Sequence, residues 1–133
     1  MTVLELTTAK LAGLRILLVE DDAMLAMLLE RTLQRLGITV LGPVGSLSKA
    51  LDLARFQEFD GAILDVTIQG GDVYPVADLL MTRGIPFVLA TGYRVEHLPA
   101  NIRGQRLLRK PYSNDEITDA LQYIAETTLK RAT

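Results

Sequence analysis

Apolar and polar positions along the chain follow two alternating periods. Short segments that contain apolar runs, of a length that suits buried strands, predict strands over residues 14–19, 38–41, 60–65, 85–90 and 105–108. The segments between and after these runs predict helices over residues 23–36, 46–56, 73–82 and 113–129. This order of elements predicts an α/β fold, a doubly wound five-stranded parallel sheet with helices on both faces.

Local signals mark where the predicted helices begin and end. Asp22 and Ser46 are suitable N-caps, and Ser113 with Glu116 forms a capping box before the last helix. Gly37 ends the first helix, and a Gly70-Gly71 turn precedes the third. The first helix carries a leucine stripe at helical spacing, which we expect to face the core: Leu25, Leu28, Leu29, Leu33 and Leu36.

The pattern is interrupted between Gly92 and Gly104. These thirteen residues contain two glycines and Pro99, so only a turn or two of helix fits there. A crossover between parallel strands is normally helical. We therefore expect the fourth helix of the fold to be short, displaced or largely missing.

Composition limits the class of protein. A chain of 133 residues, 49% hydrophobic, suits one domain with one core, which we expect over residues 13–133 after an N-terminal extension, residues 1–12. The net charge of −2 argues against a nucleic-acid partner, and the absence of cysteine excludes thiolate metal sites. No segment resembles a secretory signal or reaches the roughly 18 apolar residues of a membrane span. We expect a cytoplasmic protein without membrane contact.

Polar residues follow four of the predicted strands. The strand over residues 14–19 is followed by the acidic triplet Glu20-Asp21-Asp22, and Asp65, Thr91 and Lys110 stand at or just past the ends of three others. The carboxyl ends of parallel strands line one edge of a sheet, where ligand crevices form. We therefore expect carboxylates, a hydroxyl and an ammonium group to gather at that edge.

Carboxylates gathered in this way are suited to binding a divalent cation. Mg²⁺ takes hard oxygen ligands and keeps several waters. Asp22 and Asp65, with a backbone carbonyl and waters, would supply such ligands, and Asp21 or Glu20 could assist.

The same edge also suits phosphoryl chemistry. Asp65 stands alone at a strand end, which makes it the candidate nucleophile for forming an acyl phosphate. Lys110 and the cation would neutralise the added negative charge. The Thr91 hydroxyl could donate a hydrogen bond to a phosphoryl oxygen, and Gly92 leaves space for the incoming group.

Four motifs occur together, in order, and their combination is specific: Leu17-Leu18-Val19-Glu20-Asp21-Asp22, Ala62-Ile63-Leu64-Asp65, Ala90-Thr91-Gly92 and Arg109-Lys110-Pro111. Over about residues 14–131 the chain resembles the receiver domain of a two-component response regulator. The resemblance implies a flavodoxin-like strand order, 2-1-3-4-5. It also implies Mg²⁺-dependent phosphorylation of Asp65 by a histidine kinase or histidine phosphotransfer protein. By the same resemblance Thr67 lies beside the phosphoryl group, and its backbone carbonyl is a metal ligand.

A narrower resemblance covers Pro86–Tyr93, which is similar to the Pro-Phe-x-Phe-Ala-Thr-Gly signature of the alphaproteobacterial FAT GUY regulators. The chain departs from the common receiver pattern at Leu107, where a switch aromatic is usual, and at Gln69, where a proline is usual. We therefore hypothesise that Tyr93 gates phosphoryl access or takes over part of the switch.

The sequence is compatible with several functions. The last helix ends close to Thr133, so we expect no output domain. We expect the receiver to act as a phosphorelay component, a phosphate sink or a switch on a downstream regulator protein. We do not expect an enzyme, because the protein would catalyse only its own phosphorylation and dephosphorylation. A phosphorylation-independent binding module is the alternative. A phosphatase using Asp65 is less favoured because Thr67 replaces the expected second acid, and a flavin-binding protein lacks its phosphate loop.

Overall fold

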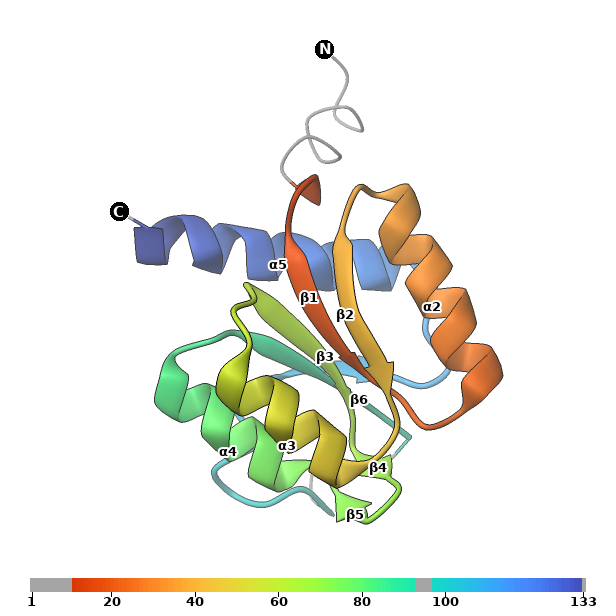
Figure 1. Cartoon of the computed structure of the whole chain (residues 1–133), viewed down its shortest axis with the longest axis vertical. Helices are drawn as coiled ribbons and strands as arrows, with labels where there is room; N and C mark the ends of the chain where they lie inside the picture. The colour runs from red at the N-terminus through yellow and green to blue at the C-terminus, as the bar shows by residue number, and fades with distance from the viewer. Residues whose placement is uncertain (1–10, 93–96, 133) are drawn as a thin grey trace.

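A five-stranded parallel sheet forms the centre of the computed structural model, which describes residues 11–92 and 97–132 (Figure 1). In spatial order the strands are β2 (Thr39–Val44), β1 (Arg15–Val19), β3 (Gly61–Asp65), β6 (Phe87–Thr91) and β7 (Arg106–Arg109). Counted along the chain within this sheet, the order is 2-1-3-4-5. The predicted fold class and strand order are therefore confirmed.

Helices cover both faces of the sheet (Figure 1). They are α2 (Ala23–Arg35) and α5 (Asn114–Ala132) on one face, and α3 (Leu47–Phe56) and α4 (Tyr74–Arg83) on the other. Strand side chains alternate between the faces, so in β1 Ile16 and Leu18 pack towards α2 and α5, whereas Leu17 packs towards α3 and α4. No helix among the described residues has both the length and the apolar character needed to cross a membrane.

The leucine stripe of α2 is only partly buried. Ala26, Leu29 and Leu33 are buried and define the face that packs on the sheet. Leu28 is 52% exposed, so the expectation that it faces the core is wrong. With about 3.6 residues per turn, Leu28 lies well to the side of the face set by the three buried residues.

The connection between β6 and β7 lacks an α-helix in residues 97–105, the part of it that the structure describes. Turns replace the helix, and the Ile102 N–H donates to the Pro99 carbonyl at 2.9 Å. Leu98 and Ile102 are buried in the core beneath α3 and α4. The prediction of a short or missing fourth helix is confirmed. The Tyr93 hypothesis lies outside the described residues.

A short antiparallel ladder between β3 and α4 goes beyond the turn that the sequence predicts. It pairs β4 (Thr67–Ile68) with β5 (Gly71–Asp72). Gly70 and Gly71 have φ angles of +96° and +130°, a backbone conformation that side chains disfavour. The two glycines therefore let the chain reverse immediately after the sheet edge.

The end of the N-terminal extension belongs to the packed structure. Leu11 is fully buried in the core cluster on the α2 and α5 face. The Gly13 N–H donates to the Gly37 carbonyl at 2.9 Å, which ties this segment to the turn after α2. The core on this face thus extends to Leu11.

Candidate functional site

The registers of the central strands bring the polar residues to one edge. β3 pairs with β6 so that Asp65 lies beside Ala90, and β6 pairs with β7 so that Thr91 lies beside Arg109. The Lys110 N–H then donates to the Thr91 carbonyl at 2.9 Å. The last residues of three neighbouring strands are thereby fixed relative to each other, as the parallel arrangement requires.

Lys110 joins two buried carboxylates. Its Nζ lies 3.1 Å from Asp65 Oδ1 and 3.3 Å from Glu20 Oε1. Glu20 is 4% exposed and Asp65 is 7% exposed, whereas about a third of the Lys110 side chain reaches solvent. Such a pair of buried carboxylates is stable only if a cation compensates it, and Lys110 provides that charge.

Three carboxylates form a cluster that suits a metal ion. Glu20, Asp21 and Asp65 each offer one oxygen, and these three oxygens lie within 4.8 Å of one another. Asp21 is exposed, so the cluster opens to solvent on that side. Carboxylate oxygens are the hard ligands that Mg²⁺ takes, and the open side leaves room for the waters that it keeps. The residues present therefore fit a Mg²⁺ ion.

The structure gives the carboxylate of Asp22 a different partner. Asp22 Oδ1 accepts a hydrogen bond from the Leu25 N–H at 3.0 Å, which makes Asp22 the N-cap of α2. Its own N–H donates to Glu20 Oε2 at 3.3 Å. Of the predicted site residues, Asp21, Asp65 and Lys110 thus converge with Glu20, whereas the Asp22 side chain lies outside the carboxylate cluster.

Burial and mutual repulsion perturb the acidic groups. Burial, with a hydrogen bond and the charge of Asp65, raises the pKa of Glu20 to about 7, although the Asp22 N–H and Lys110 act in the opposite direction. Burial lowers the pKa of Lys110, but the hydrogen bonds and charges of Asp65 and Glu20 outweigh it and raise this pKa overall. Lys110 is therefore an ammonium ion at neutral pH, while Glu20, with a pKa of about 7, titrates close to neutral pH.

The two threonines differ in exposure. Thr91 ends β6 and is buried, and Thr67 begins β4 and is exposed. Leu107, at the position of the usual switch aromatic, is half-buried and packs into the core beneath α3 and α4. No aromatic hydroxyl can act from that position.

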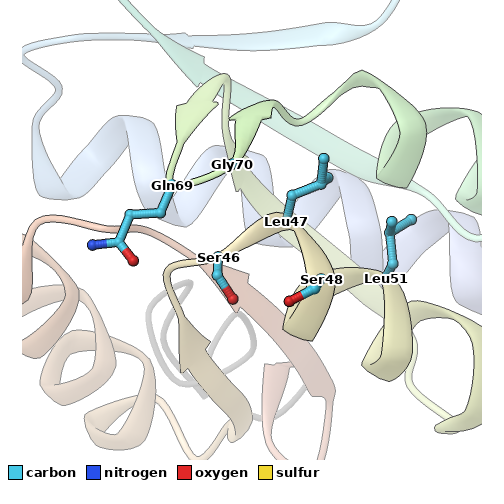
Figure 2. Close-up of a pocket in the computed structure, with 6 residues that line it drawn as sticks. All are labelled: Ser46, Leu47, Ser48, Leu51, Gln69 and Gly70. Atoms are coloured by element: carbon cyan, nitrogen blue, oxygen red, sulfur yellow. The ribbon is translucent and has the colours of Figure 1, made fainter.

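Two pockets of similar size lie near this end of the sheet. One, of about 360 Å³, is lined by Leu25, Lys110, Pro111 and Tyr112. The other, of about 350 Å³, lies between the start of α3 and the Gln69–Gly70 turn (Figure 2). The second is lined by serines, leucines, a glutamine and a glycine, with no titratable group. The chemistry described above therefore belongs to the carboxylate cluster and its lysine.

The fold and this arrangement define the class of protein. Residues 16–122 match the family described as "Response regulator receiver domain", which spans most of the chain. The chain belongs to the response regulator receiver family.

Individual proteins of known structure or curated function share this similarity. SdrG from Sphingomonas melonis Fr1 is 38% identical, with a TM-score of 0.73, over 84% of this chain and 95% of SdrG. The receiver domain of the sensor histidine kinase PA1611 from Pseudomonas aeruginosa PAO1 is 25% identical, with a TM-score of 0.75, over 86% of this chain and 99% of that one. Its structure has a magnesium ion coordinated in the active site cleft.

The curated relatives are longer than this chain. The transcriptional regulatory protein PdtaR of Mycobacterium tuberculosis is 28% identical over 112 residues, which cover 81% of this chain and 55% of PdtaR. The chain therefore spans about half the length of the curated relatives it matches.

Proposed function

We propose that this receiver accepts a phosphoryl group on Asp65, in a Mg²⁺-dependent reaction, from a phosphohistidine of a histidine kinase or a histidine phosphotransfer protein. The observation that carries the proposal is the contact of Lys110 Nζ with Asp65 Oδ1 at 3.1 Å, beside a carboxylate cluster that fits a divalent cation. A nucleophilic carboxylate, a cation site and a fixed ammonium are the parts that phosphoryl transfer requires.

The transfer step follows from these groups. An Asp65 carboxylate oxygen attacks the phosphorus, a P–O bond forms, and the P–N bond to the donor histidine breaks with its electron pair remaining on the imidazole. When bound, Mg²⁺ neutralises the charge that builds up on the phosphoryl oxygens. Lys110, in contact with Asp65, neutralises further negative charge on these oxygens. Thr91, at the end of the neighbouring strand, is the proposed hydroxyl donor to a phosphoryl oxygen.

We propose a set of metal ligands that the carboxylate cluster supports. Asp21 and Asp65 would hold Mg²⁺, with the backbone carbonyl of Thr67, and Glu20 would support them from its buried position. Asp21 takes the role that the sequence pattern gave first to Asp22, because the carboxylate of Asp22 caps α2.

After phosphorylation we propose that the domain acts by contact, as a phosphorelay component, a phosphate sink or a switch on a downstream regulator protein. The family membership supports a partner of this kind. Residues 97–105 connect two site-bearing strands and are fastened to α4 by a 3.0 Å hydrogen bond from Asn101 to Asp78. Movement of Thr91 or Lys110 therefore has a physical route to α4.

The test is phosphorylation with acetyl phosphate, followed on a Phos-tag gel. We expect the wild type to give a shifted band that requires Mg²⁺, and Asp65→Asn to give none. Asp52→Asn is the matched control, since Asp52 is exposed on α3, away from the sheet edge.

If the wild type shows no shift, addition of BeF₃⁻ and Mg²⁺ distinguishes the remaining possibilities by NMR. Chemical-shift changes at Asp65 and Thr91 would show a competent site that takes phosphate only from its protein donor. Unchanged spectra would contradict the proposal and favour a phosphorylation-independent binding module.

A further inference from the structure

Tyr112 places an aromatic hydroxyl in the cavity that Lys110 of the carboxylate cluster also lines. It follows Lys110-Pro111, its ring packs against the core on the α2 and α5 face, and it shares the 360 Å³ cavity with Leu25 and Lys110. The hydroxyl oxygen is buried and has no hydrogen-bond partner among the residues that the structure describes. A buried polar atom without a partner is rare, because its loss of hydration is not compensated.

The electrostatic surroundings make this hydroxyl a donor. Burial raises the pKa of Tyr112 above its usual value, and the negative charges of Glu20 and Asp65 raise it further. The hydroxyl therefore keeps its proton at neutral pH. The cation of the same cavity, Lys110, already contacts both carboxylates.

Glu20 has acceptor capacity to spare. The Asp22 N–H and Lys110 Nζ donate to it, each at 3.3 Å, the long end of the range for a hydrogen bond. A carboxylate offers about four lone-pair positions. An unpartnered donor thus shares a cavity with Lys110, whose Nζ contacts Glu20 at 3.3 Å, and Glu20 accepts from both the Asp22 N–H and Lys110 at long distances.

We propose that Tyr112 is a positioning residue of the phosphorylation site, whose hydroxyl donates a hydrogen bond to the Glu20 carboxylate when the site holds its metal ion. Side-chain rotation, or one water held between the two groups, completes this contact. The bond fixes Glu20, and through Glu20 it fixes Lys110 against Asp65. This inference rests on the proposed function, because it concerns the same site.

The test compares Tyr112→Phe, which removes only the oxygen, with the wild type. We expect Mg²⁺ affinity, measured by NMR titration, to fall by about threefold to tenfold, the equivalent of one hydrogen bond. The rate of phosphorylation by acetyl phosphate should fall by a similar factor. The Asp22 amide resonance of the Mg²⁺-bound protein should also move, since this N–H donates to the same carboxylate.

Tyr123→Phe is the matched control, because the Tyr123 ring lies on α5 under Arg106, with its centroid 5.2 Å from the guanidinium carbon. It should leave Mg²⁺ affinity and the Asp22 resonance unchanged. The inference is overturned if Tyr112→Phe matches the wild type in affinity, rate and spectrum and merely melts at a higher temperature, as a buried hydroxyl without function would predict. If the wild type itself neither binds Mg²⁺ nor takes phosphate, the proposed function fails as well.

Discussion

Lys110 Nζ lies 3.1 Å from Asp65 Oδ1, although the two residues are 45 positions apart in the chain. Two strand pairings create this contact, β3 with β6 and β6 with β7. The same ammonium reaches Glu20, which is 90 positions away in sequence, at 3.3 Å. One side chain therefore compensates the carboxylates that follow β1 and end β3.

Lys110→Gln should slow phosphorylation of Asp65 by at least about tenfold, because the cation that neutralises the phosphoryl charge is lost. In Mg²⁺-free buffer it should also lower the free energy of unfolding by about 1–2 kcal/mol, since the carboxylates of Glu20 and Asp65 are left uncompensated while the exposure of Lys110 moderates the loss. Phos-tag kinetics and urea unfolding in EDTA measure the two effects. Lys49→Gln, on the exposed side of α3, is the control and should change neither.

Glu20 should make the Mg²⁺-free protein less stable as the pH rises. Its pKa is about 7 in the folded protein, against an ordinary value of 4.5, so between these values the folded state holds a proton that the unfolded state has released. The contribution of Glu20 to the free energy of unfolding is therefore greatest at or below about pH 4.5. It decreases by up to about 3 kcal/mol as the pH rises through 7.

Urea unfolding from pH 5 to pH 8 in EDTA, for the wild type and Glu20→Gln, measures this effect. The stability difference between the two proteins should change steadily in favour of Glu20→Gln as the pH rises. Glu126→Gln, on the exposed side of α5, should track the wild type at every pH. A constant difference between wild type and Glu20→Gln would contradict the raised pKa.

Substitutions of Asp21 and Asp22 should have different effects, on Mg²⁺ binding and on stability respectively. Asp21→Asn should weaken Mg²⁺ binding by at least about tenfold, because it removes a charged ligand of the cluster. Asp22→Asn should leave both affinity and stability nearly unchanged, since asparagine caps helices as well as aspartate does. Asp22→Ala should lower the free energy of unfolding by about 1 kcal/mol through loss of the cap.

Calorimetric Mg²⁺ titrations and urea unfolding distinguish these variants. Equal losses of Mg²⁺ affinity in Asp21→Asn and Asp22→Asn would restore Asp22 as a ligand and disprove the assignment made from the geometry.

Gly45→Ala should weaken Mg²⁺ binding without touching any carboxylate. A Cβ at Gly45 would lie 3.0 Å from the Asp21 Cα and 3.3 Å from its Cβ, so Asp21 must move by a few tenths of an ångström. Metal affinity is sensitive to ligand position, and we expect a loss of about threefold or more. The control is Gly104→Ala, where a Cβ would meet nothing within 4 Å. NMR titration with Mg²⁺ measures both, and equal affinities would show that Asp21 adjusts freely.

The order of the main-sheet strands and their helices, the fold class and the edge at which the polar residues gather all follow from the sequence. Helices flank β3 on both faces, and the strand therefore carries successive apolar residues, Ala62, Ile63 and Leu64, before it ends at Asp65. The lack of an α-helix in residues 97–105 is also predictable, because Gly92, Pro99 and Gly104 leave no uninterrupted helical segment. These are local properties, and neighbouring residues suffice to specify them.

The pairing of individual side chains at the site depends on the tertiary structure. An aspartate before an apolar segment is equally suited to capping a helix and to binding a metal, and only the three-dimensional arrangement assigns Asp22 to the cap and brings Asp21 and Glu20 to Asp65. The unpartnered hydroxyl of Tyr112 is likewise invisible in the sequence. Distances between groups on different strands are set by sheet register and helix packing. Because these depend on contacts between residues far apart in the sequence, no local sequence pattern predicts them.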